Sequence, residues 1–271
     1  MNEYIQIEFP DLSAEQRDIA IAQLIVAGFE GFEETNAGLK AFILKKYYNA
    51  GVVKEIALLL ETIFTTTIIE ETNWNKVWES NFEPVVVDDF VAVRAAFHKP
   101  IKGVEHEIII TPKMSFGTGH HATTYMMIRQ MRHIDFAGKT VFDFGTGTGI
   151  LAILAEKLGA KKIVAIDNDD WSIENAGENI LRNNCSSIDL LKADTPAPHI
   201  SFDVVLANIN KNVILGNFAL LSNRLTTGGI LLVSGLLKED EDVVFRKSIE
   251  YSLQLIQTAV RDNWLCLRFS C

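Results

Sequence analysis

A glycine-rich loop near the middle of the chain offers the clearest chemistry in the sequence. Residues 142–149 read Phe-Asp-Phe-Gly-Thr-Gly-Thr-Gly and lie between a strand-like run and a helix-like run. Glycines let the backbone pass close to a ligand, and free N–H groups at a helix start attract negative charge. The spacing is GxGxG, with Ile150 where the dinucleotide fingerprint has its third glycine. Gly145 and Gly147 are therefore predicted to contact a cofactor; the alternative is a tight strand–helix turn.

Two acidic residues follow the next two predicted strands. Asp167 ends the strand after the loop, where an acidic residue is expected to accept the ribose hydroxyls of a nucleotide. Asp194 ends the following strand and is placed to reach an adenine amino group. The alternatives are a helix N-cap or surface residue for Asp167 and a capping or loop carboxylate for Asp194.

Strands and helices alternate from residue 139 onward, which predicts a parallel sheet covered on both faces. The expected strands are 140–144, 163–167, 188–191, 204–207 and 230–234, and the expected helices are 150–158, 171–183, 212–225 and 239–251. Residues 255–261 and 264–269 then read as two strands joined by a tight turn at Asp262-Asn263. The last strand of this sheet is therefore predicted to be antiparallel.

Residues 1–69 are predicted to form a separate small domain. Their element order is β-α-β-β-α-β, which is typical of the ferredoxin-like fold, with strands at 5–9, 29–35, 39–45 and 63–69 and helices at 14–27 and 52–60. Ser13 and Gln16 predict a capping box at the first helix, and Gly28 marks its end. The module contains no catalytic constellation.

Residues 70–83 are expected to be a linker. Trp74 and Trp78 lie four residues apart in it, a spacing typical of a packing seam between modules. The second domain then covers residues 84–271, with strand-like runs at 84–97 and 106–111 before the glycine loop. The predicted fold class is α/β, a mostly parallel sheet with an antiparallel terminal hairpin, preceded by a small α+β domain.

The pattern Asp143-x-Gly145-x-Gly147 followed by Asp167 resembles the S-adenosylmethionine site of the Rossmann-like methyltransferases. An antiparallel terminal hairpin fits that class and does not fit the nicotinamide-dependent dehydrogenases. Further motifs are Trp74-x-x-x-Trp78, the sequence Asn-Phe-Glu-Pro at 81–84, Ser-Phe-Gly-Thr-Gly-His-His-Ala-Thr-Thr at 115–124, and Ala-Asn-Ile-Asn at 207–210. Together they resemble the bacterial ribosomal protein L11 methyltransferase (PrmA) family over nearly the whole chain. The family's FGTGTHPTT appears here as FGTGHHATT, with His120 and Ala122 at the two changed positions.

This resemblance implies a cofactor, a substrate and site residues. The cofactor is S-adenosyl-L-methionine, and the implied contact positions are Thr124, Gly145, Asp167 and Asn208. The implied reaction is methylation of lysine side chains and the α-amino group of ribosomal protein L11, which the small domain recognises. Asn208 and backbone carbonyls near Ile209 are expected to accept amine N–H groups and aim the lone pair, without a dedicated general base. The alternative for Asn208 is a strand-end turn residue.

No metal site is expected. His120 and His121 are adjacent on a loop and lack the i, i+4 spacing that places two ligands on one helical face. The three cysteines have no CxxC spacing, which argues against both a disulfide framework and a zinc site. The histidines are predicted to be polar residues that line the crevice.

Composition limits the partners. Hydrophobic residues make up 48% of the chain and charged residues 22%, which excludes a disordered or fibrous protein. The apolar runs fall short of the ~20 residues of a membrane span, and no signal peptide is visible, so the expected location is the cytoplasm, without a membrane partner. The net charge of −10 is opposite to that of most proteins that bind a phosphate backbone, so no direct nucleic-acid contact is expected.

Two other functions are compatible with the same motifs. One is an RNA or small-molecule methyltransferase on the same fold, which the acidic composition disfavours when the substrate is RNA. The other is a cofactor-binding module without catalysis. The acidic charge itself is explained either by solubility or by a basic macromolecular partner.

Overall fold

The computed structural model describes residues 4–34, 38–69, 83–112, 119–195 and 200–271. The chain divides into two compact units, 1–81 and 82–271, and each unit has its own buried hydrophobic core. Of the predicted linker over 70–83, only Glu83 falls within the described residues. Trp74 and Trp78 therefore lie outside them.

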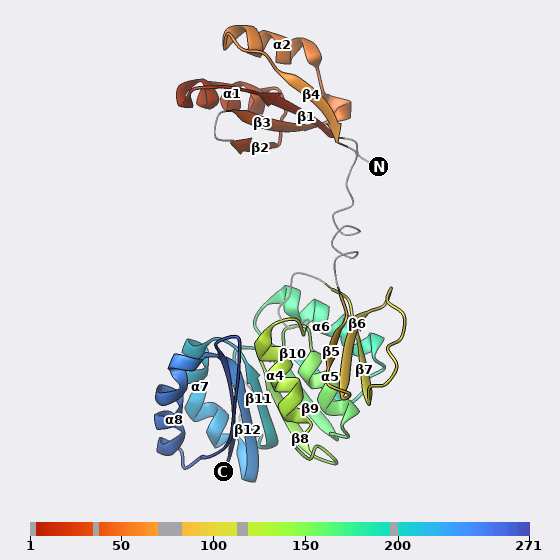
Figure 1. The fold of residues 1–271 in the computed structure, drawn as a ribbon, viewed down its shortest axis with the longest axis vertical. Helices are drawn as coiled ribbons and strands as arrows, with labels where there is room; N and C mark the ends of the chain where they lie inside the picture. Colours follow the sequence, from red (N-terminus) through yellow and green to blue (C-terminus); the bar gives the residue numbers. More distant parts are fainter. Residues whose placement is uncertain (1–3, 35–37, 70–82, 113–118, 196–199) are drawn as a thin grey trace. The chain divides into compact units, whose positions relative to one another are not determined.

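The small unit has the β-α-β-β-α-β order that the sequence predicts. Its elements are β1 (Tyr4–Phe9), α1 (Ala14–Val26), β2 (Gly31–Glu34), β3 (Leu39–Leu44), a short 3₁₀ turn (Lys45–Tyr47), α2 (Ala50–Leu59) and β4 (Thr65–Ile69). The strands form one antiparallel sheet in the order β2-β3-β1-β4 (Figure 1). The capping box of Ser13 and Gln16 is present at the start of α1. Alternate residues of β1 and β3 are buried, so one face of this sheet forms the core.

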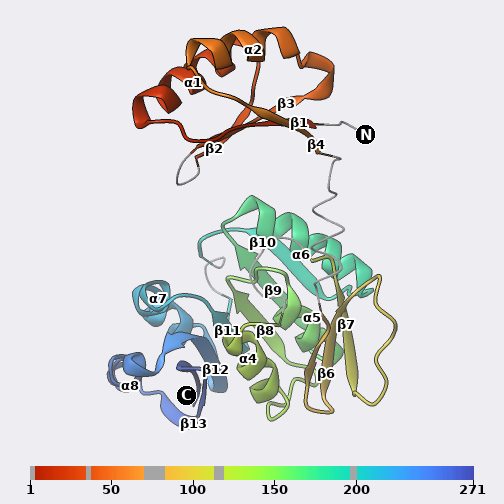
Figure 2. The same cartoon turned by 45° about the horizontal axis from the view of Figure 1, so that its top comes forward.

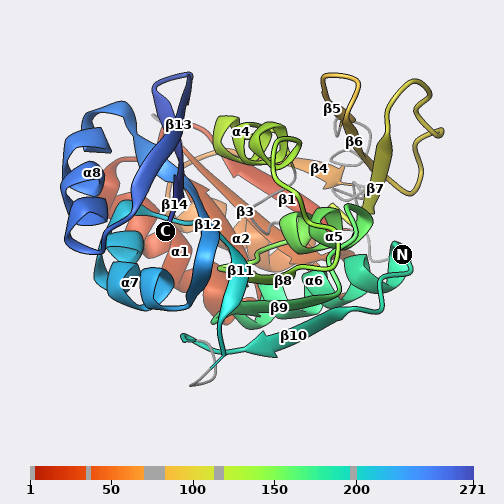
Figure 3. The same ribbon diagram turned by 90° about the horizontal axis from the view of Figure 1, so that it is seen from below.

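The larger unit is built on a seven-stranded sheet in the order β10-β9-β8-β11-β12-β14-β13. The strands are β8 (Thr140–Phe144), β9 (Lys162–Asp167), β10 (Ile188–Lys192), β11 (Phe202–Asn208), β12 (Leu225–Leu237), β13 (Gln254–Arg261) and β14 (Trp264–Ser270). The first five strands in this order are parallel, and β14 pairs antiparallel with both β12 and β13 (Figure 3). The predicted antiparallel terminal hairpin is confirmed.

Helices cover both faces of this sheet. They are α4 (Ala122–Met131), α5 (Ile150–Lys157), α6 (Asp170–Arg182), α7 (Lys211–Asn223) and α8 (Glu241–Glu250). One core cluster joins the sheet to α4, α5 and α6, and the other joins it to α7 and α8. Figure 2 shows α7 and α8 on one side of the larger unit, apart from α4, α5 and α6. In the described part of the chain, no helix has the length and apolar character needed to cross a membrane.

A second, three-stranded sheet packs against α6. It consists of β5 (Val85–Val87), β6 (Val91–Ala95) and β7 (His106–Ile110). The Asn183 side chain accepts the Ile109 N–H at 3.0 Å and donates to the Ile109 carbonyl at 2.6 Å, as a neighbouring strand would do. Asn179 accepts the Thr111 N–H at 2.7 Å and donates to the Thr148 carbonyl at 2.9 Å. Two amide side chains thus fix the free edge of β7 and connect it to the glycine loop.

Replacement of Asn183 tests this edge. Asn183→Ala leaves the Ile109 N–H and carbonyl without these partners, so we expect the free energy of unfolding to fall by about 1–3 kcal/mol. Urea unfolding followed by circular dichroism measures the change. The neighbouring exposed residue provides the control, because Arg182→Ala is expected to change stability by less than about 0.5 kcal/mol. Equal stability of the two variants would show that the side chain of Asn183 does not hold this edge.

Candidate functional site

Three parallel strands bring the predicted site residues to one edge of the sheet. Phe144, the last residue of β8, is paired with Ile166 of β9 and with Ala207 of β11. Gly145 therefore begins the loop beside Asp167 and Asn208, which end the two flanking strands. Ligands of open α/β sheets bind at the carboxyl ends of such strands. The site is formed by residues that lie 22 to 63 positions apart in the sequence.

The glycine loop closes tightly over β9. The N–H groups of Gly145 and Thr146 both donate to the Ile166 carbonyl at 2.9 Å. Gly145, Gly147 and Gly149 have φ angles of +74°, +55° and +79°, a region that side chains with a Cβ rarely occupy. A Cβ added to Gly145 would lie 2.9 Å from Cδ1 of Ile209. The loop therefore requires glycine at this position both for its φ angle and for the approach of Ile209.

Asp167 is fixed by backbone donors. Its Oδ2 accepts the Gly147 N–H at 2.9 Å, and its Oδ1 accepts the Asp169 N–H at 3.1 Å. The N-cap of α6 is Asp169, whose side chain accepts the Ser172 N–H. A carboxylate has about four acceptor positions, so Asp167 keeps the capacity to accept further hydrogen bonds.

A second carboxyl group lies beneath the loop. Asp143 is 1% exposed, and Oγ1 of Thr146 donates to its Oδ2 at 2.6 Å. Burial raises the pKa of Asp143 to about 7, which the nearby Asp167 charge also favours and the Thr146 hydrogen bond opposes. Near pH 7 the side chain of Asp143 is therefore partly protonated and partly ionised.

Asn208 carries an unpaired acceptor. Its Nδ2 donates to Oγ1 of Thr124 at 3.2 Å, which joins the end of β11 to the first turn of α4. The residue is 8% exposed, and its Oδ1 has no hydrogen-bond partner among the described residues. Buried polar atoms in folded proteins usually have a partner, so a free acceptor at a sheet edge indicates a ligand with an N–H group. The N-cap of α7 is Asn210, not Asn208.

Ile209 is held between two glycines. Its side chain packs on Gly145, and its N–H donates to the Ser234 carbonyl at 3.2 Å. A Cβ added to Gly235 would lie 2.1 Å from the Ile209 carbonyl oxygen, and Gly235 has a φ angle of +88°. The backbone after Asn208 therefore rests directly on β12. The sequence analysis did not identify Gly235 as a site residue. Its only signal in the sequence is a glycine directly after a predicted strand.

The other predicted residues lie just after β10 and just before α4. Asp194 is exposed and lies two positions after the end of β10, so its contact with adenine stays a prediction. Residues 115–118 of the motif lie outside the described residues. His121 caps α4 by accepting the Thr123 N–H, and Nε2 of His120 lies 2.9 Å from the Glu83 carbonyl oxygen. Within the described ranges, no three His, Cys, Asp or Glu residues are grouped to hold a metal ion.

The residues at this edge fit S-adenosylmethionine. The glycine loop carries no Cβ at Gly145, Gly147 or Gly149, so a ligand can approach its backbone closely. The fixed Asp167 carboxylate suits ribose hydroxyls, and the orphaned Asn208 Oδ1 suits an amine.

Alanine substitutions at two glycines distinguish the stability cost of a strained backbone from the cost of lost close packing. Gly228 has a φ angle of +75° and open space at its Cβ, whereas Gly235 has a similar φ and the Ile209 carbonyl at its Cβ. Gly228→Ala is expected to cost about 1–2 kcal/mol of stability through its φ angle alone. Gly235→Ala is expected to cost more and to displace Asn208, with at least tenfold weaker binding of S-adenosylmethionine by calorimetry. Equal losses and equal binding in both variants would contradict this role of Gly235.

Comparison with known proteins identifies the family. Residues 10–271 match the family model described as "Ribosomal protein L11 methyltransferase (PrmA)". A ribosomal protein L11 methyltransferase from Porphyromonas gingivalis is 40% identical over 268 residues, which cover 93% of this chain and 90% of the relative. One from Bacteroides fragilis is 36% identical over 260 residues, which cover 93% of each chain.

A solved structure is also similar. The ribosomal protein L11 methylase from Lactobacillus delbrueckii subsp. bulgaricus has a TM-score of 0.65 and 29% sequence identity. The match covers 70% of this chain and 98% of that chain. The family model spans both units of the chain, including the glycine loop, Asp167 and Asn208. The chain therefore belongs to the ribosomal protein L11 methyltransferase (PrmA) family.

Proposed function

We propose that this protein is an S-adenosylmethionine-dependent N-methyltransferase that modifies lysine side chains and the α-amino group of ribosomal protein L11 in the cytoplasm. The observation that carries the proposal is the buried, unpaired Oδ1 of Asn208 beside the glycine loop. Family membership over residues 10–271 supports the reaction and the substrate. The first observation concerns the geometry of the site, and the second is a similarity of sequence.

The chain's own residues would hold the cofactor from three strand ends. The backbone of Gly145 and Gly147 lies close to it, Asp167 accepts its ribose hydroxyls, and Thr124 and Asn208 close the site from α4 and β11. Asp194 is proposed to reach the adenine amino group. S-adenosylmethionine supplies a methyl group on a sulfonium that is already activated for displacement. The task of the protein is therefore to place a lone pair behind that methyl group.

The energetic difficulty lies in the amine. A lysine amine has a pKa of about 10.4, so at pH 7 roughly one in two thousand is neutral, a cost of roughly 4–5 kcal/mol. An α-amino group, with a pKa of about 7.7–8.0, costs only about 1 kcal/mol. Oδ1 of Asn208 accepts one N–H of the neutral amine and so directs the lone pair away from itself. Nδ2 of Asn208 donates to the Thr124 hydroxyl, which leaves Oδ1 as the unpaired end of the amide.

The Ile209 carbonyl has a smaller part in this proposal than the sequence suggested. That oxygen lies against Gly235, so β12 covers part of its surface. Ile209 acts mainly by keeping Asn208 next to Gly145. The small unit is proposed to recognise the ribosomal protein, since the described residues of the larger unit already provide every group assigned to the cofactor.

Methyl transfer to purified ribosomal protein L11 tests the proposed function. Labelled S-adenosylmethionine is incubated with the enzyme and either L11 or naked ribosomal RNA, and mass spectrometry locates the modified groups. Mass gains on the amines of L11 are expected. Label on the RNA alone would replace this proposal by an RNA methyltransferase, and bound cofactor without transfer to either substrate would favour a non-catalytic module.

Substitutions at the pair Asn208 and Thr124 test the role of the unpaired acceptor. Asn208→Ala is expected to lower kcat about 10- to 100-fold, the value of one hydrogen bond to a reacting group. Thr124→Val removes the acceptor for Asn208 Nδ2 and should cost less, and the double variant should cost little more than Asn208→Ala alone. Asn223→Ala, an exposed residue at the end of α7, is the control. Unchanged turnover of Asn208→Ala would remove the proposed role of this residue.

Removal of the small unit tests its part in recognition. A chain that lacks residues 1–69 keeps both core clusters of the larger unit, so we expect it to fold and to bind S-adenosylmethionine with unchanged affinity. Its kcat/KM for intact L11 is expected to fall at least 100-fold, whereas methylation of a free lysine derivative at high concentration should be retained. Full activity on L11 would show that the larger unit recognises the substrate alone.

A further inference from the structure

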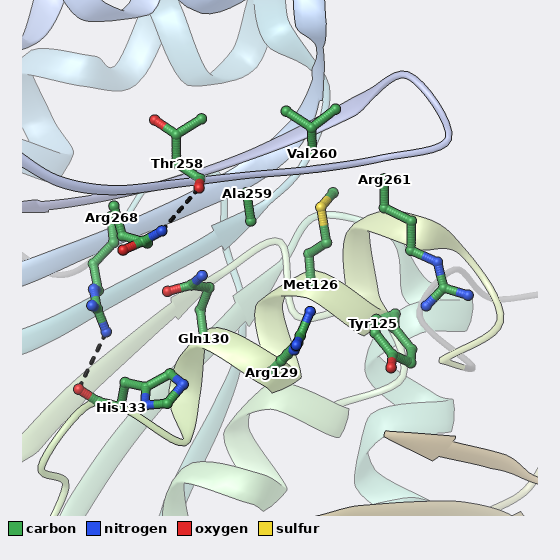
Figure 4. A pocket seen from close by; sticks show the side chains of 11 residues that line it. Tyr125, Met126, Arg129, Gln130, His133, Thr258, Ala259, Val260, Arg261 and Arg268 are labelled. Carbon is green, nitrogen blue, oxygen red and sulfur yellow. Dashed lines mark hydrogen bonds between the residues drawn. The ribbon is translucent and has the colours of Figure 1, made fainter. Parts of the chain in front are cut away.

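A groove of about 820 Å³ lies between α4 and β13 of the larger unit (Figure 4). Arginines from three elements line it, namely Arg129 of α4, Arg261 of β13 and Arg268 of β14. None of the described residues that line the groove is acidic, although the chain has 35 acidic and 25 basic residues. The groove is thus a basic area on an acidic protein.

One of these guanidinium groups, that of Arg268, has an edge without a partner among the described residues. Arg129 pairs with Asp88 at 3.2 Å, and Arg261 lies 3.5 Å from Asp262. Arg268 has no ion-pair partner in the described part of the chain; its Nη1 donates to the His133 carbonyl at 3.2 Å (Figure 4). Its Nε is buried and has no hydrogen-bond partner there. The remaining edge, Nε with Nη2, is the one that binds the two oxygens of a carboxylate.

A buried acceptor in the same groove lacks a partner. Gln130 is 9% exposed, and its buried Oε1 has no hydrogen-bond partner among the described residues. A buried donor and a buried acceptor that lack partners both cost stability unless a ligand satisfies them. An inorganic anion would satisfy only Arg268. A polypeptide segment with an acidic side chain satisfies both, because a main-chain N–H reaches Gln130 and the carboxylate reaches Arg268.

The groove and the predicted site share the helix α4. Tyr125 lines the groove and directly follows Thr124, which is bonded to Asn208. From Thr124 to Gln130 is six residues of α4, or about 9 Å along a helix that rises about 1.5 Å per residue. An extended chain covers that distance in about three residues. A substrate whose amine meets Asn208 therefore places a residue about three positions away next to Gln130, in the groove that Arg268 also lines.

We propose that this groove binds an acidic side chain of the protein substrate about three residues from the methylated amine, with Arg268 as the carboxylate partner and Gln130 as the main-chain partner. The inference rests on the proposed function, because it takes the amine at Asn208 as its reference point. It adds a specificity determinant on the catalytic unit.

Steady-state kinetics with ribosomal protein L11 as the varied substrate test the groove. Arg268→Gln is expected to raise KM for L11 about tenfold, the effect of one charge-assisted hydrogen-bonded pair, with kcat within about twofold of wild type. The dissociation constant of S-adenosylmethionine should not change. Arg246→Gln, which removes an exposed arginine of α8, is the matched control and should leave KM unaltered.

Two more variants keep the test decisive if Arg268→Gln folds poorly. Gln130→Glu places a carboxylate in the groove, where it competes with that of the substrate and should also raise KM. Arg268→Lys keeps the charge without the two-donor edge and should have an intermediate KM. Wild-type KM should increase with ionic strength more steeply than that of Arg268→Gln.

The outcomes separate this inference from the proposed function. Absence of L11 methylation by the wild-type enzyme would overturn the proposed function itself. Normal L11 methylation with an unchanged KM in both Arg268→Gln and Gln130→Glu would overturn only the groove. Loss of single-stranded RNA binding in Arg268→Gln, with an unchanged KM for L11, would also overturn it and assign the groove to a nucleic acid.

Discussion

The close approach of Ile209 to two glycines is the contact on which the site depends. Gly145 leaves room for its side chain, and Gly235 leaves room for its carbonyl group. Because of these two contacts, the ends of β8, β11 and β12 pack closely, and Asn208 is held beside the glycine loop. The position of Thr124 follows, since its hydroxyl accepts from Asn208 across the gap to α4. A packing constraint in the backbone thus determines where the polar groups of the site lie.

The fold was largely predictable because its signals are local and periodic. Alternating βα units, the glycine loop and the Asp262-Asn263 turn each place one element, and the antiparallel hairpin follows from them. β12 was predicted too short, at 230–234 rather than Leu225–Leu237, since its ends are stabilised by pairing with β11 and β14. The helix α4 was not predicted at all. Eight of its ten residues are buried, so it lacks the polar face from which an amphipathic helix is recognised.

The site was predictable as a set of residues but not as a set of contacts. Asp167 and Asn208 were identified from their places at strand ends. The bond between Asn208 and Thr124 joins residues 84 positions apart, and Asn179 bonds Thr111 across 68 positions and Thr148 across 31. The role of Gly235 depends on a carbonyl group contributed by a different strand. Such contacts arise from tertiary packing, and the residue types and spacings along the chain do not show which pairs will meet.

The buried carboxyl group beneath the loop has a consequence for the pH at which the protein works. The pKa of Asp143 in the folded chain is about 7 against an ordinary value of 3.8, so the folded state holds its proton more tightly than the unfolded state. The stability gained from that proton is complete below about pH 3.8 and is lost as the pH rises through about 7. Amines become nucleophiles over the range above pH 7. Above pH 7, where amines become more nucleophilic, the proton of Asp143 therefore no longer stabilises the loop.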